Sequence, residues 1–395
     1  MNGKLEKVQE FIEKNRDEML KFWEELVNMQ GYSKETERVN LVIERVKEEF
    51  EKIGFKCRRE SSQGNADVLI GILGEEREKK PIIFSGHVDT VFPQGTFEEN
   101  PFYIKEGKAY GPGVMDMKGG IVIALYVVKA LNELGYQDHP IKIIIVGDEE
   151  IGHTGSISYE IMAREAKGGC CAFNMEPGRM DDCLTVGRKG NVDCHVIVHG
   201  VGGHVGNAFL QGRNAIEEMA YKILKLQKLT DYKNGNVVSV DVIQGGMVSN
   251  AIPDLCKIEI DARFTESDQM EVIKEQILEV CSETYIEGTT TEVDFVNSMP
   301  AFESTPEIMS LYHFINTVAQ ENSLTEYEYG YKIVGGNSDA AYISQVGTPV
   351  LCSCGVKGDK AHTKEEYAFV DSLFERTKLF VLVLLELWRF EGDKR

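Results

Sequence analysis

The chain has 395 residues, 42% of them hydrophobic, which is enough apolar material for more than one core. Its 43 basic and 64 acidic side chains give a formal charge of −21, so neither nucleic acid nor an anionic membrane is expected as a partner. The nine cysteines form no CxxC pair, and the charged N-terminal segment lacks the apolar stretch of a signal peptide. These features predict reduced thiols and a cytoplasmic location.

Residues 1–186 alternate between helical and strand-like segments. Apolar residues recur at helical spacing over 4–28 and 35–53, and residues 119–134 form a third, more uniformly apolar helix. Residues 67–73, 81–84 and 141–146 are strand-like. Continuous apolar strands between helices predict an α/β fold with a mostly parallel central sheet and helices on both faces. Ligands of such sheets bind beyond the C-terminal ends of the strands.

The pattern changes after residue 186. Strand-like segments are predicted over 191–198, 236–243, 255–263 and 292–297, with helices over 215–229 and 268–284. This β-α-β-β-α-β order is typical of a ferredoxin-like α+β domain, a small antiparallel sheet with two helices on one face. Helical character resumes near residue 306, and 348–352 is again an apolar strand. We therefore predict a discontinuous catalytic domain, 1–186 and 300–395, with a domain of residues 187–299 inserted.

Five short stretches place an acidic residue or a histidine at a strand end or in a glycine-rich turn. They are SGHVDTVFP (85–93), GPGVMDMKGG (111–120), VGDEEIG (146–152), FNMEPG (173–178) and KAHTKEEY (360–367). Singly, each is explained by turn chemistry, a helix cap or a solvated charge. Together they match a two-zinc site with a bridging carboxylate, and the Asp116 loop is the natural bridge.

The same stretches resemble the metallopeptidase M20 family, which contains glutamate carboxypeptidases, aminoacylases, succinyl-diaminopimelate desuccinylases and peptidase T. The resemblance is carried by the ordered set H-x-D, D-M-K-G, E-E, E-P and a late A-H, and it covers nearly the whole chain. The stretches at 85–93, 111–120 and 173–178 are most similar to the glutamate-carboxypeptidase branch.

The resemblance implies a complete metal site. One Zn²⁺ would be held by His87 and Glu176 and the other by Glu150 and His362, with Asp116 bridging them and followed by a cis peptide bond. Co²⁺ or Mn²⁺ could occupy the same ligands. Asp89 would fix the tautomer of His87, and Glu149 would act as the general base.

In the inserted domain, the resemblance points to His204 and Arg263. His204, within residues 199–215, matches a histidine that reaches the partner subunit's active site, although its neighbours differ from the family's usual Ser-His-Ala-Gly. Arg263 resembles an arginine that grips a substrate carboxylate with its bidentate fork. An ion pair with Asp261 or Glu259 is the alternative for Arg263.

Two further residues resemble substrate contacts. Asn250 corresponds to a contact with the reacting carbonyl or the substrate carboxylate. Gly335 opens a loop whose backbone N–H groups would line the pocket. Ordinary turn chemistry explains either residue equally well.

The expected function is that of a co-catalytic di-zinc amidohydrolase that removes the C-terminal amino acid from a small peptide or an N-acyl amino acid. The resemblance also implies a homodimer formed through the inserted domain. An aminoacylase, N-deacetylase or dipeptidase with the same metal site is the first alternative. A catalytically silent relative that only binds ligand is a more distant one, because it would be expected to have lost the base or the metal ligands.

Overall fold

The computed structural model describes residues 2–208, 210–325 and 327–392. The chain forms two compact units. The first contains the residues up to Gly187, Ser304–Ile333 and the residues from Ser338 on, and the second contains Arg188–Glu303 and Val334–Asn337. The second unit therefore extends a few residues beyond the predicted 187–299. It also takes in a short strap that includes Gly335.

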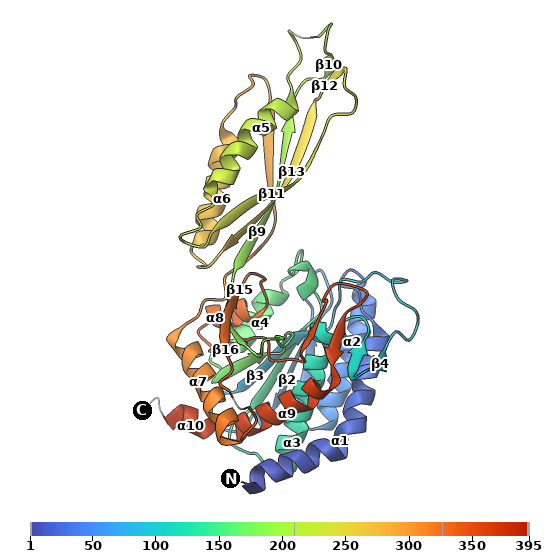
Figure 1. Ribbon diagram of the computed structural model, residues 1–395, viewed down its shortest axis with the longest axis vertical. Coiled ribbons are helices and arrows are strands. Elements are labelled where there is room, and N and C mark those ends of the chain that lie inside the picture. Colours follow the sequence, from blue (N-terminus) through green and yellow to red (C-terminus); the bar gives the residue numbers. More distant parts are fainter. Residues whose placement is uncertain (1, 209, 326, 393–395) are drawn as a thin grey trace. The chain divides into compact units, whose positions relative to one another are not determined.

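The first unit is built on a six-stranded mixed sheet (Figure 1). Its strands, in spatial order, are β1 (Lys56–Glu60), β2 (Val68–Leu73), β6 (Ile141–Val146), β3 (Ile82–His87), β7 (Cys171–Asn174) and β16 (Val350–Leu351). The β6–β3, β3–β7 and β7–β16 pairs are parallel, as predicted. The other two pairs are antiparallel, because β1 and β2 form a hairpin at the sheet edge.

Helices cover this sheet and bury its apolar strands. They are α1 (Asn2–Met29), α2 (Thr36–Lys52), α3 (Gly119–Glu133), α4 (Ser158–Ala166), α7 (Pro306–Glu321), α8 (Ala340–Gln345), α9 (Val370–Leu385) and α10 (Leu387–Gly392). The α1, α3 and α9 helices pack on one another, and α4 packs on α8. Buried Trp23 of α1 donates its indole N–H to Val114 O at 2.9 Å. This bond ties the helical layer to the loop that carries Asp116.

Short strands that the sequence pattern did not predict position the late histidine. β17 (Gly358–Asp359), β18 (Tyr367–Phe369), β5 (Lys108–Tyr110) and β4 (Tyr103–Lys105) form a four-stranded antiparallel sheet. The loop at 360–366 connects β17 to β18, so this sheet fixes both ends of the segment that carries His362. A separate two-stranded sheet joins β8 (Leu184–Arg188) to β15 (Tyr331–Val334).

The second unit has the predicted antiparallel sheet with helices on one face. Its strands, in spatial order, are β11 (Val237–Gly245), β13 (Leu255–Phe264), β9 (Gly190–His199) and β14 (Thr290–Met299). The helices α5 (Ala215–Leu226) and α6 (Gln269–Ser282) cover alternate residues of β9 and β13, which form the core of this unit. A small ladder of β10 (Gly203–His204) and β12 (Ala251–Ile252) lies apart from the main sheet.

The nine cysteines are free thiols. Within residues 2–208, 210–325 and 327–392, no helix has the length and apolar character needed to cross a membrane.

Candidate metal centre

Three neighbouring parallel strands bring acidic and imidazole side chains to one edge of the central sheet. β3 ends at His87, β6 leads through Gly147 into the short helix η2 (Glu149–Ile151), and β7 leads to Glu176. The carboxyl ends of parallel neighbours lie at the same edge. Parallel pairing of the three strands therefore brings these side chains together.

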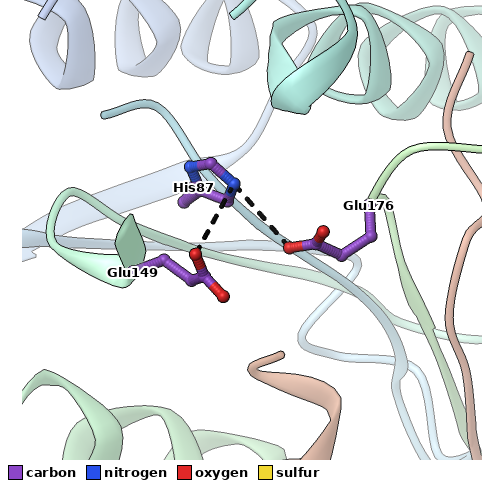
Figure 2. Close-up of side chains that lie close together, drawn as sticks. All are labelled: His87, Glu149 and Glu176. Carbon is purple, nitrogen blue, oxygen red and sulfur yellow. Dashed lines mark ion pairs between the residues drawn. The ribbon is translucent and has the colours of Figure 1, made fainter. Parts of the chain in front are cut away.

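His87 is the centre of the first group. Its Nε2 lies 3.1 Å from Asp116 Oδ1, 3.7 Å from Glu176 Oε1 and 4.0 Å from Glu149 Oε2. Figure 2 shows Glu149 and Glu176 directed at this nitrogen from different segments. Ligand atoms of His87, Glu149 and Glu176 lie within 4.8 Å of one another, and so do those of His87, Asp116 and Glu150, so His87 belongs to two candidate metal-binding groups.

His362 defines the second group. Its Nε2 lies 3.0 Å from Glu150 Oε2 and 3.5 Å from Asp116 Oδ2. Asp116 thus turns one carboxylate oxygen toward His87 and the other toward His362. Glu149 and Glu150 are consecutive, yet one faces His87 and the other His362. Asp116 is therefore the carboxylate shared by the two groups.

Buried Asp89 does more than orient His87. Its Oδ1 lies 3.3 Å from His87 Nδ1 and accepts the backbone N–H of Glu149, also at 3.3 Å. Its Oδ2 accepts the backbone N–H of Glu150 at 3.2 Å and the hydroxyl of Ser33 at 2.7 Å. One carboxylate therefore holds both the imidazole and the turn that carries the two glutamates.

The Asp116 loop is held from a distant part of the chain. The peptide bond Asp116–Met117 is cis, as the family resemblance implied. Buried Glu366 accepts backbone N–H groups of this loop, from Gly113 at 3.1 Å, Met115 at 2.8 Å and Asp116 at 3.1 Å. Sequence analysis missed Glu366. Its spacing of four residues from His362, within KAHTKEEY, was the available signal.

Electrostatics at this edge favour positive charge. Burial and the charge of Glu176 raise the pKa of Glu149 well above its ordinary value. Hydrogen bonds to Asp116 and Glu150 raise the pKa of His362 to about 11. Burial opposes a charged His87, but Asp116 and Asp89 still raise its pKa. An excess of buried carboxylates over cationic groups fits divalent cations, and imidazole with carboxylate is a zinc-type donor set.

The four remaining predicted residues lie in the second unit. His204 and Asn250 are brought side by side, because His204 pairs with Ala251 and the N–H of Val205 donates to Asn250 O at 3.1 Å. Arg263 donates to both carboxylate oxygens of Asp261, at 2.6 and 2.7 Å, so it forms the ion pair that was the alternative reading.

Gly335 lies in the strap of the second unit. The neighbouring carbonyls of Gly336 and Asn337 accept from Arg188 at 3.3 and 3.2 Å. The contact of Gly335 with substrate remains a prediction.

A mixed α/β fold with histidine and carboxylate side chains gathered at one sheet edge is typical of a metal-dependent hydrolase, and comparison with known proteins agrees. A family model described as peptidase family M20/M25/M40 matches residues 83–386. Carboxypeptidase G2 from Pseudomonas sp. (strain RS-16) is 27% identical over 374 residues, spanning 93% of this chain and 89% of that protein. Succinyl-diaminopimelate desuccinylase from Rickettsia bellii (strain OSU 85-389) is 25% identical over 394 residues, spanning 93% and 97%.

Solved structures share the fold. Aminopeptidase PepT from Bacillus cereus superposes with a TM-score of 0.78 at 21% identity, over 95% of this chain and 99% of that one. The M20 family metallo-carboxypeptidase Sso-CP2 from Sulfolobus solfataricus gives 0.74 at 16% identity, over 93% and 98%. The chain therefore belongs to peptidase family M20/M25/M40.

Proposed function

We propose that the protein is a two-metal amidohydrolase that releases a C-terminal amino acid from a small peptide or an N-acyl amino acid. The observation that carries the proposal is the position of Asp116 between two histidines, with one carboxylate oxygen facing each. A carboxylate shared in this way offsets the mutual repulsion of two cations. His87 and Glu176 would complete one metal site, and Glu150 and His362 the other.

Bound at these residues, two divalent cations supply Lewis acidity to the scissile carbonyl and to the attacking water. Glu149 is the carboxylate left over once the ligands are assigned, and its position beside His87 suits a general base that faces the attacking water. It would accept the proton of the attacking water and deliver it to the leaving amine. Asp89 would keep His87 and the turn that carries Glu149 in fixed positions while the proton is transferred.

The similarity to carboxypeptidase G2 supports a substrate with a free α-carboxylate. Arg263 would bind that carboxylate, since a guanidinium pairs with it bidentately. Because the guanidinium of Arg263 is paired with Asp261, the substrate carboxylate would have to displace Asp261 or share the guanidinium with it. The similarity to succinyl-diaminopimelate desuccinylase supports N-acyl amino acids, N-succinyl ones included, as the second substrate class.

In a homodimer, side chains of the second unit could contribute to the active sites of both subunits. Arg263 lies near the C-terminal end of β13. His204 and Asn250 lie at the β10–β12 ladder, just before the N-terminal end of β13. At ~3.3 Å per residue, the start of β13 lies roughly 26 Å from Arg263, which is too far for these side chains to reach one small substrate. We propose that Arg263 serves its own subunit, while His204 and Asn250 serve the partner's.

Exposed apolar side chains on the second unit support such a dimer. Leu224 of α5 is 65% exposed, and Ile243 on the edge strand β11 is 56% exposed. An unpaired edge strand with exposed apolar side chains is a natural surface for a second copy.

The test is a hydrolysis screen of dipeptides, N-acetyl and N-succinyl amino acids that differ in the C-terminal residue, run with enzyme of known metal content. We expect turnover only with metal bound, and loss of turnover when the free carboxylate of the substrate is amidated. Turnover that survives exhaustive chelation would contradict the metal mechanism. Equal turnover of the amidated substrate would contradict the carboxypeptidase assignment alone.

A further inference from the structure

A histidine outside the predicted metal site joins the turn that carries Glu149 and Glu150 to a distant helix. His153 is 2% exposed, and its Nδ1 lies 2.9 Å from Asp148 Oδ1. Its Nε2 lies 2.7 Å from Asp339 Oδ1, directly before α8. Both carboxylates are buried. Ser158 Oγ also lies 2.9 Å from Nδ1, but its hydroxyl donates to Asp148. Because ionised carboxylates only accept hydrogen bonds, the imidazole donates from both nitrogens and carries a positive charge.

This arrangement is costly to build, which argues against an incidental contact. The backbone φ of His153 is +57°, a left-handed conformation that non-glycine residues rarely adopt. Asp339 Oδ2 is buried and has no hydrogen-bond partner within residues 2–208, 210–325 and 327–392. His153 is therefore the group that compensates the charge of Asp339, and the surrounding fold stabilises both.

The segment held by His153 is the one whose position matters for the reaction. The η2 helix is a single turn, which by itself is a weak element. On one side, Asp89 accepts its first two N–H groups. On the other side, the loop folds back so that the N–H of His153 donates to Asp148 O at 3.0 Å. The imidazole then joins this loop to α8, and Ser158 donates to Asp148 Oδ1 at 2.7 Å.

We propose that His153 is a positioning residue that acts with Asp339 to fix the Glu149–Glu150 turn for catalysis. The inference rests on the proposed role of Glu149 as general base and extends it to residues that touch neither substrate nor metal. We call the contacts of His153 with Asp148 and Asp339 the clamp. If these contacts are broken, Glu149 samples orientations away from the attacking water. Small misplacements of a catalytic group lower kcat strongly, so we expect a loss of at least about tenfold.

The experiment measures kcat and KM per metal-loaded subunit for His153→Gln, Asp339→Asn and the double variant. We expect kcat to fall at least about tenfold in each single variant with KM nearly unchanged. The double variant should lose no more than the worse single variant, because both substitutions break one linkage. His153→Asn tolerates the left-handed backbone but is too short to span both carboxylates, so it should be as slow as His153→Gln.

The matched control is His313→Gln, since His313 is an exposed histidine 3.8 Å from Glu328, and it should behave as wild type. A purely structural role predicts lower melting temperatures with kcat per loaded subunit unchanged, and this result would overturn the proposal. Losses that multiply in the double variant would overturn it too. If Glu149→Gln stays active, the proposed function fails; if it is inactive while both clamp variants keep full kcat, the clamp alone fails.

Discussion

Glu366 offers the sharpest perturbation of the metal centre, because it contacts the Asp116 loop only through that loop's backbone. In Glu366→Gln the side chain keeps its shape, but one carboxylate oxygen becomes an NH₂ group. The native Oε1 accepts from Met115 and Asp116 and Oε2 from Gly113, so either amide orientation sets a donor against at least one N–H.

The expected cost follows from these bonds. Losing a hydrogen bond costs about 0.5–1.5 kcal/mol, and a buried donor left unsatisfied adds about 1–3 kcal/mol. The loop can relieve part of this by moving, and Asp116 then leaves its place between His87 and His362. We therefore expect metal affinity to fall by about 10–100-fold, equivalent to roughly 1.4–2.8 kcal/mol, with the remainder seen as lower stability of the metal-free protein.

The assay strips the protein with a chelator and titrates Zn²⁺ back against a competing metal indicator, alongside denaturant unfolding of the metal-free form. Glu365→Gln is the matched control, since Glu365 is the adjacent glutamate and its side chain is exposed. If Glu366→Gln and Glu365→Gln bound Zn²⁺ equally well, the three N–H contacts would not hold the bridging loop, and the reasoning would be refuted.

Three further predictions concern the base, the dimer and the clamp. Glu149→Gln should lower kcat by about 10²–10⁴-fold while metal content by elemental analysis stays at the wild-type level. Mixed dimers made by refolding Glu149→Gln with His204→Ala subunits should recover activity absent from either parent; no recovery would show that His204 serves its own subunit. Burial opposes the charge of His153, but Asp339 and Asp148 raise its pKa, so the native state binds that proton more tightly than the unfolded state. The stability advantage of wild type over His153→Gln in urea should thus be greatest below about pH 6.5 and decline by about 1.4 kcal/mol per pH unit above it; a constant difference would mean the imidazole is neutral.

The parts of the site that can be predicted from sequence are the residues that directly follow recognisable apolar strands. His87, Glu150 and Glu176 follow apolar strands, and parallel pairing alone brings such strand ends together. Asp116 and His362 also lie in the five motif stretches, and the family resemblance assigned the ligands to each metal. The positions of these two residues depend on the loop at 111–120 and on strands of two or three residues. Strands that short have no measurable periodicity, so no local pattern could have predicted them.

The groups that hold the ligands in place were not predictable in the same way. Glu366 meets a loop about 250 residues earlier in the chain, and His153 meets Asp339 about 190 residues later. The spacing of Glu366 from His362 marks it as a candidate, but no local pattern shows which N–H groups it accepts, because its partners are peptide groups that nearly every residue carries. For Arg263 the residue was recognised but its partner was not, because the sequence is compatible with both a substrate contact and the ion pair with Asp261.

Buried side chains hold both the glutamate turn and the Asp116 loop, which explains how the site tolerates its own charge. Asp89 accepts N–H groups of the glutamate turn, Glu366 accepts those of the Asp116 loop, and His153 joins the glutamate turn to Asp339. Each clamp is itself buried, so it is strong only if every hydrogen-bond partner is in place. Carboxylates gathered at one sheet edge repel one another, and flexible loops would separate to relieve that repulsion. Holding them by backbone contacts keeps the donors close before a cation arrives, so binding is not penalised by the cost of ordering them.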